Sequence, residues 1–216
     1  MSRPLRIQYP GAWYHVMNRG LNHCNIFHND EQHYIFYELL AEINKRYGVE
    51  VHAYCLMDNH YHLLLHTPNA NLSCAMQYLD GLYTKRFNSQ EKRDGPLFRG
   101  RYKAILIEAE NYILQLSRYI HLNPVSAYLC KYPENFIWSS YRAYILQAKK
   151  QEWLYCEEVL SRCSENLCIK AYSSFVKDGI DEELAQVFSK NQWPNVLGSI
   201  EWSEKIKSII HNKPKT

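Results

Sequence analysis

Residues 49–66 constrain the fold of this chain more than any other segment. A run of β-branched, aromatic and apolar side chains over 49–57 is followed by an Asp-Asn turn signal and a second apolar run over 60–66. This pattern predicts a β-hairpin. Side chains two residues apart on a strand point to the same face. His60 and His62 therefore project together from the second strand, close enough to bind one cation.

A histidine pair cannot complete a coordination shell, so a metal site here needs another ligand from elsewhere in the chain. The same spacing also occurs in half-buried ring pairs that bind nothing, because short motifs often match by chance. On its strand His66 shares the face of His62. It could support a metal ligand from outside the coordination shell or simply face solvent.

A second group of polar residues lies on a predicted helix over 111–124. Apolar residues recur there at helical spacing, and Pro124 is predicted to end the helix. Tyr119 and Asn123 are four residues apart, so they lie on one face of that helix. A phenol beside an amide oxygen suits a nucleophile next to a metal ligand. The alternative is an ordinary tyrosine on an amphipathic helix, in a chain with 18 tyrosines.

The remaining pattern predicts an α+β fold. Strands are expected over 12–18 and 102–108, and helices over 30–47 and 71–88, in addition to the hairpin and the Tyr119 helix. The order β-α-β-β-α-β-α indicates an antiparallel sheet with helices on one face, of the ferredoxin-like or RRM-like kind. We divide the chain into a domain over 1–145 and a helical C-terminal extension over 146–216.

Positive charge is concentrated in the first part of the chain. Lys and Arg outnumber Asp and Glu by 17 to 12 over residues 1–150, and are outnumbered 8 to 10 over 151–216. Within residues 85–103 basic and aromatic side chains alternate, a composition that suits single-stranded nucleic acid, although such a run can also be a solvated face. The predicted nucleic-acid-binding residues are Lys85, Arg86, Arg99, Arg101, Tyr102 and Lys103.

Other classes of protein are disfavoured by composition. The sequence has no apolar run of the ~18–20 residues that a membrane span needs, and its first residues lack a signal-peptide core. Seven cysteines without a C-x-x-C pair favour reduced thiols over a disulfide framework. We therefore expect a cytoplasmic protein.

Several stretches together resemble a known family, the single-tyrosine HUH transposases of the IS200-like superfamily, and within it the REP-associated tyrosine transposases. Order and spacing agree over about residues 5–145. The matching stretches are 13–20 (WYHVMNRG), 60–62 (HYH), 83–88 (YTKRFN), 95–103 (GPLFRGRYK), 119–125 (YIHLNPV) and 138–141 (WSSY). Three positions depart from the family pattern. Asp58 stands where proline is frequent, Tyr61 replaces the usual aliphatic residue, and Asn123 stands where glutamine is common.

The resemblance implies an enzyme, a metal-dependent single-strand DNA endonuclease and strand transferase. Tyr119 would attack the DNA and form a 5′-phosphotyrosine intermediate at hairpin-containing repeats such as REP palindromes. His60, His62 and Asn123 would hold Mg²⁺ or Mn²⁺. The expected partner is single-stranded or hairpin DNA, and the protein would act in DNA transposition and recombination as a monomer or a homodimer.

Two other functions fit the same residues. The first is a non-catalytic nucleic-acid-binding protein, in which Tyr54 and Tyr61 stack on bases and the histidines merely pack. The second is a metal-dependent hydrolase in which water is the nucleophile. Salt-sensitive binding indifferent to metal would indicate the first, and multiple turnover without protein-linked DNA the second.

Overall fold

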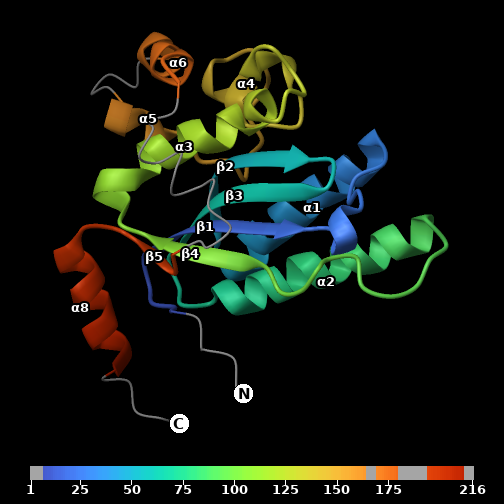
Figure 1. The fold of residues 1–216 in the computed structure, drawn as a ribbon, viewed down its shortest axis with the longest axis horizontal. Helices are drawn as coiled ribbons and strands as arrows, with labels where there is room; N and C mark the ends of the chain where they lie inside the picture. The colour runs from blue at the N-terminus through green and yellow to red at the C-terminus, as the bar shows by residue number, and fades with distance from the viewer. Residues whose placement is uncertain (1–6, 164–168, 180–193, 212–216) are drawn as a thin grey trace.

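A five-stranded sheet organises the part of the chain that the computed structural model describes, residues 7–163, 169–179 and 194–211 (Figure 1). The strands are β1 (Ala12–Arg19), β2 (Glu50–Met57), β3 (His60–Thr67), β4 (Lys103–Ile107) and β5 (Val196–Leu197). The α-helices are α1 (Asp30–Tyr47), α2 (Leu72–Gln90), α3 (Ala109–Ser126), α4 (Tyr141–Tyr144), α5 (Glu157–Cys163), α6 (Ile169–Lys177) and α8 (Ile200–His211).

The strand order is β2-β3-β1-β4-β5, and the first four strands are antiparallel to their neighbours. The predicted α+β fold and the order of its elements are confirmed. β5 was not predicted. It pairs in parallel with β4 and covers a strand edge that would otherwise expose unpaired backbone groups. Among the described residues after 146, this short strand accompanies the helices α5, α6 and α8.

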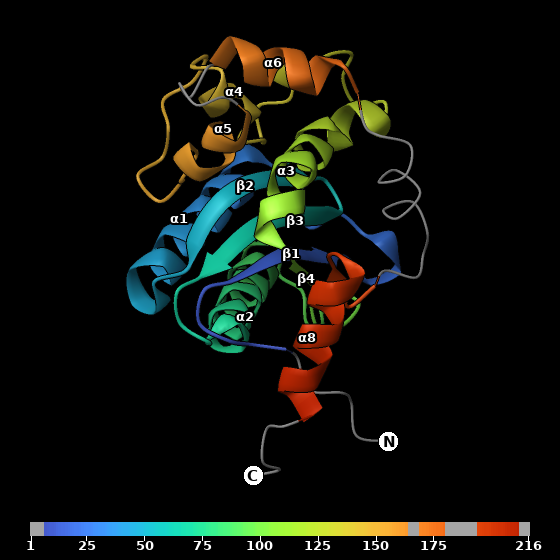
Figure 2. The same ribbon diagram turned by 90° about the vertical axis from the view of Figure 1, so that its left-hand side faces the viewer.

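The two faces of the sheet are covered by different helices. Tyr61 on β3 is fully buried, lies 5.0 Å from the Phe36 ring of α1, and donates a hydrogen bond to Asp80 of α2. His62, the next residue, points to the opposite face and contacts Tyr119 of α3. The predicted helix layer thus consists of α1 and α2, and α3 crosses the other face over β2 and β3 (Figure 2). Tyr61 packs on the helix-covered face, as expected.

Local signals explain the bounds of α1. The Asn29 side chain accepts a hydrogen bond from Gln32 N at 3.0 Å, and the Gln32 side chain accepts one from His28 N at 2.7 Å. These bonds satisfy backbone donors at the start of the helix. The helix ends at Gly48, whose φ of 65° is the left-handed conformation that glycine adopts without strain. The helix runs over the predicted residues because both of its ends carry such signals.

The end of α3 differs from the prediction. Pro124 was expected to end the helix, but α3 continues to Ser126. Proline removes one N–H from the helix, but Ala127 N still donates to Asn123 O at 2.9 Å and closes the last turn. At the start of α2, Asn71 precedes Leu72 and makes no side-chain capping bond, while its Nδ2 donates to Tyr47 O at 2.7 Å. Among the described residues, no helix is long and apolar enough to cross a membrane.

A buried polar network joins α3 to the C-terminal helices. His121 Nε2 lies 2.7 Å from Ser140 Oγ, and His121 Nδ1 lies 2.7 Å from the Tyr172 hydroxyl of α6. Ser140 Oγ also donates to Tyr54 O on β2. Burial lowers the pKa of His121 to about 3, so its ring is neutral at pH 7. This network anchors the helix that carries Tyr119.

Candidate active site

A cavity of about 850 Å³ lies on the α3 side of the sheet, where β1 ends and β3 begins. Most of the residues predicted for the site meet there, although they come from separate elements. Its lining comprises Met17, Asn18, Arg19, His23, Asn59, His60, His62, Arg99, Gly100, Arg101, Lys103, Tyr119 and Asn123.

The two histidines of β3 share this cavity, as the strand alternation predicted. Their ring centroids are 5.0 Å apart. Burial lowers the pKa of His60 to about 4 and holds that of His62 well below its usual value. Both rings are therefore neutral at pH 7, which is the form that binds metal ions.

Hydrogen bonds indicate which nitrogen of each ring remains available. His60 Nδ1 lies 2.6 Å from Asn59 Oδ1. An amide oxygen only accepts, so His60 Nδ1 carries the proton and Nε2 keeps its lone pair. His62 Nδ1 lies 2.9 Å from His15 Nε2. When His62 donates in this pair, its Nε2 is likewise left as a ligand.

Tyr119 stands edge-on to the histidines. Its ring centroid lies 5.7 Å from that of His62, with the planes at 89°, and 5.8 Å from that of His15. Burial raises the pKa of Tyr119 to about 12, although a hydrogen bond with the Asn123 side chain opposes the shift. The group is thus a neutral phenol at pH 7 and must lose its proton before it can act as a strong nucleophile.

Asn123 lies one helical turn beyond Tyr119. Its Nδ2 donates to Tyr119 O at 2.9 Å within α3. This bond uses the nitrogen of the amide, so the oxygen is the atom that can serve as a third ligand. The sequence had placed these two residues on one helix face, and the structure brings both to the cavity that holds the histidines.

The basic side of the cavity is formed by Arg99, Arg101 and Lys103, all exposed. Their segment is fixed to the end of β1, because Arg99 N donates to Arg19 O at 3.0 Å. Gly20 follows at this turn, where a side chain would place its Cβ 2.0 Å from Cys24 O. The turn therefore depends on glycine.

Four other predicted residues lie outside the cavity lining. Arg86 pairs with Glu38 and Glu42 of α1, and Lys85 lines a separate hollow of about 430 Å³ at the end of α2. Tyr102 is only 5% exposed, so its ring is not available for base stacking. His66 lies at the far end of β3, where it pairs with Glu50 rather than supporting His60 or His62.

Sequence reasoning missed His15 and Arg19 as parts of this site. Both lie on β1 and share the cavity face, since His62 is the cross-strand partner of Met17. The alternation of β1 places His15, Met17 and Arg19 on one face. Only the register between β1 and β3, which the sequence does not reveal, shows that this face meets His62.

The fold and the site define an α+β protein that presents a tyrosine to two neutral histidines beside a basic cavity. The sequence profile described as "Transposase IS200 like" matches residues 8–123, more than half of the chain. The chain belongs to this family, the IS200-like transposases. A comparison with curated proteins gives no match.

Eight chains among solved structures match this protein. One is a REP-associated tyrosine transposase bound to a REP hairpin, with 15% sequence identity, a TM-score of 0.57, and coverage of 72% of this chain and 92% of the other. At this identity the similarity shows the fold. Another, from Deinococcus radiodurans R1 and provisionally assigned as a transposase, has 20% identity, covers 62% of this chain and 97% of its own, and has a TM-score of 0.39.

Proposed function

We propose that this protein is a single-strand DNA endonuclease and strand transferase in which Tyr119 becomes linked to a 5′-phosphate. The observation that carries the proposal is the position of Tyr119, whose ring stands against His62 in a cavity bordered by Arg99 and Arg101. Membership of the transposase family supports a DNA substrate. The solved relative bound to a REP hairpin supports hairpin-containing repeat DNA.

The residues present fit a bound divalent cation. His60 and His62 offer neutral imidazoles, and Asn123 offers an amide oxygen. We propose that these three side chains hold Mg²⁺ or Mn²⁺, with open positions for water and a phosphate oxygen. When bound, the cation would stabilise negative charge on the phosphate as the bond to the leaving oxygen breaks.

The tyrosine carries out the bond exchange. The Tyr119 oxygen attacks the phosphorus, a Tyr–O–P bond forms, and the P–O3′ bond breaks. The phenol loses its proton, and the leaving 3′-oxygen gains one to become a hydroxyl. The new phosphotyrosine ester conserves the energy of the phosphodiester, so a free 3′-hydroxyl can later reverse the step without ATP. Because the pKa of Tyr119 is about 12, removal of its proton is a substantial part of the barrier.

The exposed cations would hold the DNA backbone. Arg99, Arg101 and Lys103 line the cavity, where they can neutralise phosphates that flank the cleaved bond. Lys85, with Lys92 and Arg93 beside it, would extend this surface. We further propose that residues 146–216 are an extension of the catalytic domain over 1–145 and steady α3 through contacts such as that of Tyr172 with His121.

The two alternative functions fare differently. A stacking platform of the RRM kind needs exposed rings on the central strands, but Tyr54 is 5% exposed and Tyr61 is fully buried. The two tyrosines expected to stack on bases in a non-catalytic binding protein are therefore not accessible to them. A hydrolase that uses water would need the same ligands, so only an experiment separates it from tyrosine attack.

Denaturing gel electrophoresis distinguishes attack by Tyr119 from attack by water. The protein is mixed with Mn²⁺ and a 3′-labelled hairpin oligonucleotide whose sequence comes from repeats that flank the gene. We expect a labelled band at protein size in the wild type and none in Tyr119→Phe. Tyr112→Phe is the matched control, because it removes a half-buried hydroxyl from the same helix away from the cavity. It should retain the band.

The other outcomes are equally informative. Cleavage by both the wild type and Tyr119→Phe, without a covalent band, would replace the proposal with the hydrolase. Binding of the oligonucleotide without cleavage at any Mn²⁺ concentration would favour a non-catalytic binding protein.

A further inference from the structure

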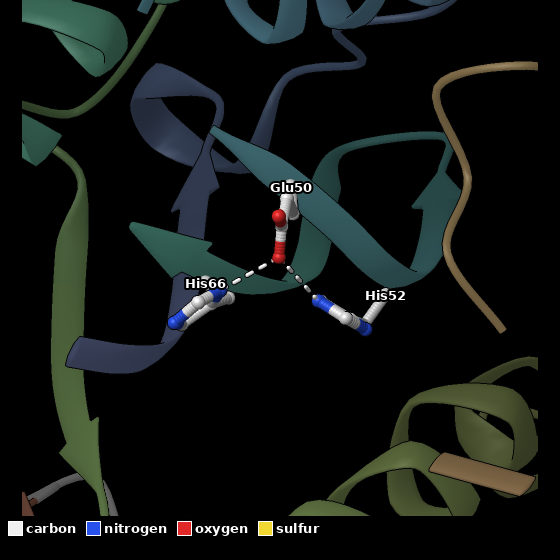
Figure 3. Close-up of side chains that lie close together, drawn as sticks. All are labelled: Glu50, His52 and His66. Atoms are coloured by element: carbon white, nitrogen blue, oxygen red, sulfur yellow. Dashed lines mark hydrogen bonds and ion pairs between the residues drawn. The ribbon is translucent and has the colours of Figure 1, made fainter. Parts of the chain in front are cut away.

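A second cluster of potential metal ligands lies at the opposite end of the hairpin from His60. Glu50 and His52 are on β2, and His66 is the cross-strand partner of Glu50 on β3. Glu50 Oε2 lies 2.6 Å from His66 Nδ1 and 3.4 Å from His52 Nε2 (Figure 3). His66 is six residues along β3 from His60, about 20 Å away at strand rise, so this cluster is separate from the active site.

A β-bulge brings these side chains together. The register of β2 against β3 shifts between Val51 and Ala53, which leaves His52 as the extra residue. A bulge of this kind changes the direction of a side chain. Here the His52 ring lies beside Glu50, so that three potential ligand atoms, one from each side chain, are all within 4.8 Å of one another.

Neighbouring rings hold the two imidazoles in place. Trp13 stacks on His66 with centroids 4.7 Å apart and lies 4.3 Å from His52. The Tyr155 ring lies 5.9 Å from His52, and Tyr155 N donates to Val51 O at 2.9 Å. The segment that precedes α5 is therefore docked against this end of the sheet.

His52 is the unusual member of the cluster. It is 3% exposed, and neither ring nitrogen makes a hydrogen bond of good geometry in the described structure. Its closest charged group is the Glu50 carboxylate at 3.4 Å. Among the described residues, His52 Nδ1 has no hydrogen-bond partner and Nε2 has only this long contact with Glu50, which is uncommon for a buried polar group and requires an explanation. A ligand that accepts the lone pair of His52 Nε2 would supply one.

We propose that Glu50, His52 and His66 bind Zn²⁺, with water in the fourth position. Two imidazoles and one carboxylate form a known zinc donor set. Tetrahedral zinc with bonds of ~2.0–2.2 Å places its ligand atoms roughly 3.4 Å apart, which is the present separation of Glu50 from His52. The Glu50–His66 pair must open by about 0.8 Å on the same geometry, which rotation of a partly exposed carboxylate can provide.

The choice of zinc follows from the donors. Two imidazoles with one carboxylate oxygen are a donor set that zinc binds in tetrahedral geometry. Partial exposure of Glu50 and His66 gives the ion access and allows water to bind. Zinc here would join β2 to β3 across the bulge and strengthen the strand on which Tyr155 docks. This site is independent of DNA cleavage, and so it stands or falls separately from the proposed function.

The number of zinc ions bound by a variant that lacks His60 and His62 tests the proposal. The full chain is freed of metal and carries His60→Ala and His62→Ala, so that zinc at the cavity does not contribute. Titration calorimetry with Zn²⁺ should show one bound equivalent, and the thermal midpoint should rise. Adding His66→Gln should abolish both effects. His66 is partly exposed, so its replacement is compatible with folding, which circular dichroism verifies.

Two further variants make the result specific. Glu50→Gln keeps the side-chain shape and should also lose the bound equivalent. His28→Gln is the matched control, because His28 forms another histidine–glutamate pair, with Glu91 at 3.0 Å, and its loss should leave the stoichiometry at one. The proposal is overturned if the background variant binds no zinc, or if it binds equally well after His66→Gln and Glu50→Gln.

Discussion

The His15–His62 contact allows the proposed metal dependence to be tested at a residue that would touch neither metal nor DNA. His15 is fully buried on β1, and its Nε2 lies 2.9 Å from His62 Nδ1. When His62 Nδ1 donates to His15 in this bond, His62 Nε2 is left available as a metal ligand. His15→Phe removes the acceptor for His62 Nδ1, while the phenyl ring fills the space of the imidazole. His62 would lose its fixed tautomer and orientation.

The size of the effect follows from the contact. Loss of a residue that orients a metal ligand typically weakens metal affinity ~10–100-fold, or about 1.4–2.8 kcal/mol at 25 °C. A buried hydrogen-bond donor that loses its acceptor costs about 1–3 kcal/mol, which is the same range. We expect the Mn²⁺ concentration for half-maximal cleavage to rise ~10–100-fold in His15→Phe, with the maximal rate largely recovered at saturating Mn²⁺.

The assay is cleavage of a labelled hairpin as a function of Mn²⁺ concentration. His15→Gln provides the rescue, because its side-chain oxygen can accept from His62 Nδ1, and its Mn²⁺ requirement should lie between those of the wild type and His15→Phe. An unchanged Mn²⁺ requirement in His15→Phe would refute the reasoning. A lower rate that Mn²⁺ does not restore would show instead that His15 acts through Tyr119, whose ring it also contacts.

Three other predictions concern stability. His121→Phe should lower the free energy of unfolding by about 1–3 kcal/mol, because it removes one hydrogen bond from each of the buried hydroxyls of Ser140 and Tyr172; urea denaturation measures this. Burial lowers the pKa of His121 to about 3 in the folded state, against 6.5 when unfolded. Its contribution is therefore complete above pH 6.5 and declines as the pH falls toward 3, so denaturation at pH 7 and pH 5 should show a loss that is smaller in His121→Phe. Gly20→Ala should lower the thermal midpoint, since its Cβ would meet Cys24 O at 2.0 Å, whereas Gly100→Ala, with open space around it, should not.

The parts of the fold that the sequence predicted are those with local signals. The Asn29 cap and Gly48 define the ends of α1, and a two-residue turn sets the register of the hairpin. Alternation then places His60 and His62 together without knowledge of any other strand. In the same way, helical spacing alone puts Tyr119 and Asn123 on one face.

What the sequence could not predict depends on contacts between distant segments. The composition of residues 85–103 suggested one DNA-binding surface, but Arg86 is paired with acidic residues of α1, and the Tyr102 ring is buried. Arg99 and Arg101 reach the cavity because a backbone bond to Arg19 fixes their loop. The sequence shows how many positively charged residues a segment carries. It does not show which of them form ion pairs, because the acidic partners lie on other elements.

The two histidine clusters of the hairpin differ in the same way: the His60–His62 pair follows from local alternation, whereas the cluster of Glu50, His52 and His66 depends on how two strands pair. His60 and His62 obey regular alternation, so their proximity can be read directly from the sequence. His66 follows the same alternation, which is compatible with supporting a metal ligand or with facing solvent. Its actual partner, Glu50, faces it across the hairpin, and His52 joins them only because a bulge interrupts β2. Alternation identifies the residues of a face, but register and bulges decide which of them meet, so a ligand group spread over two strands needs the structure to be found.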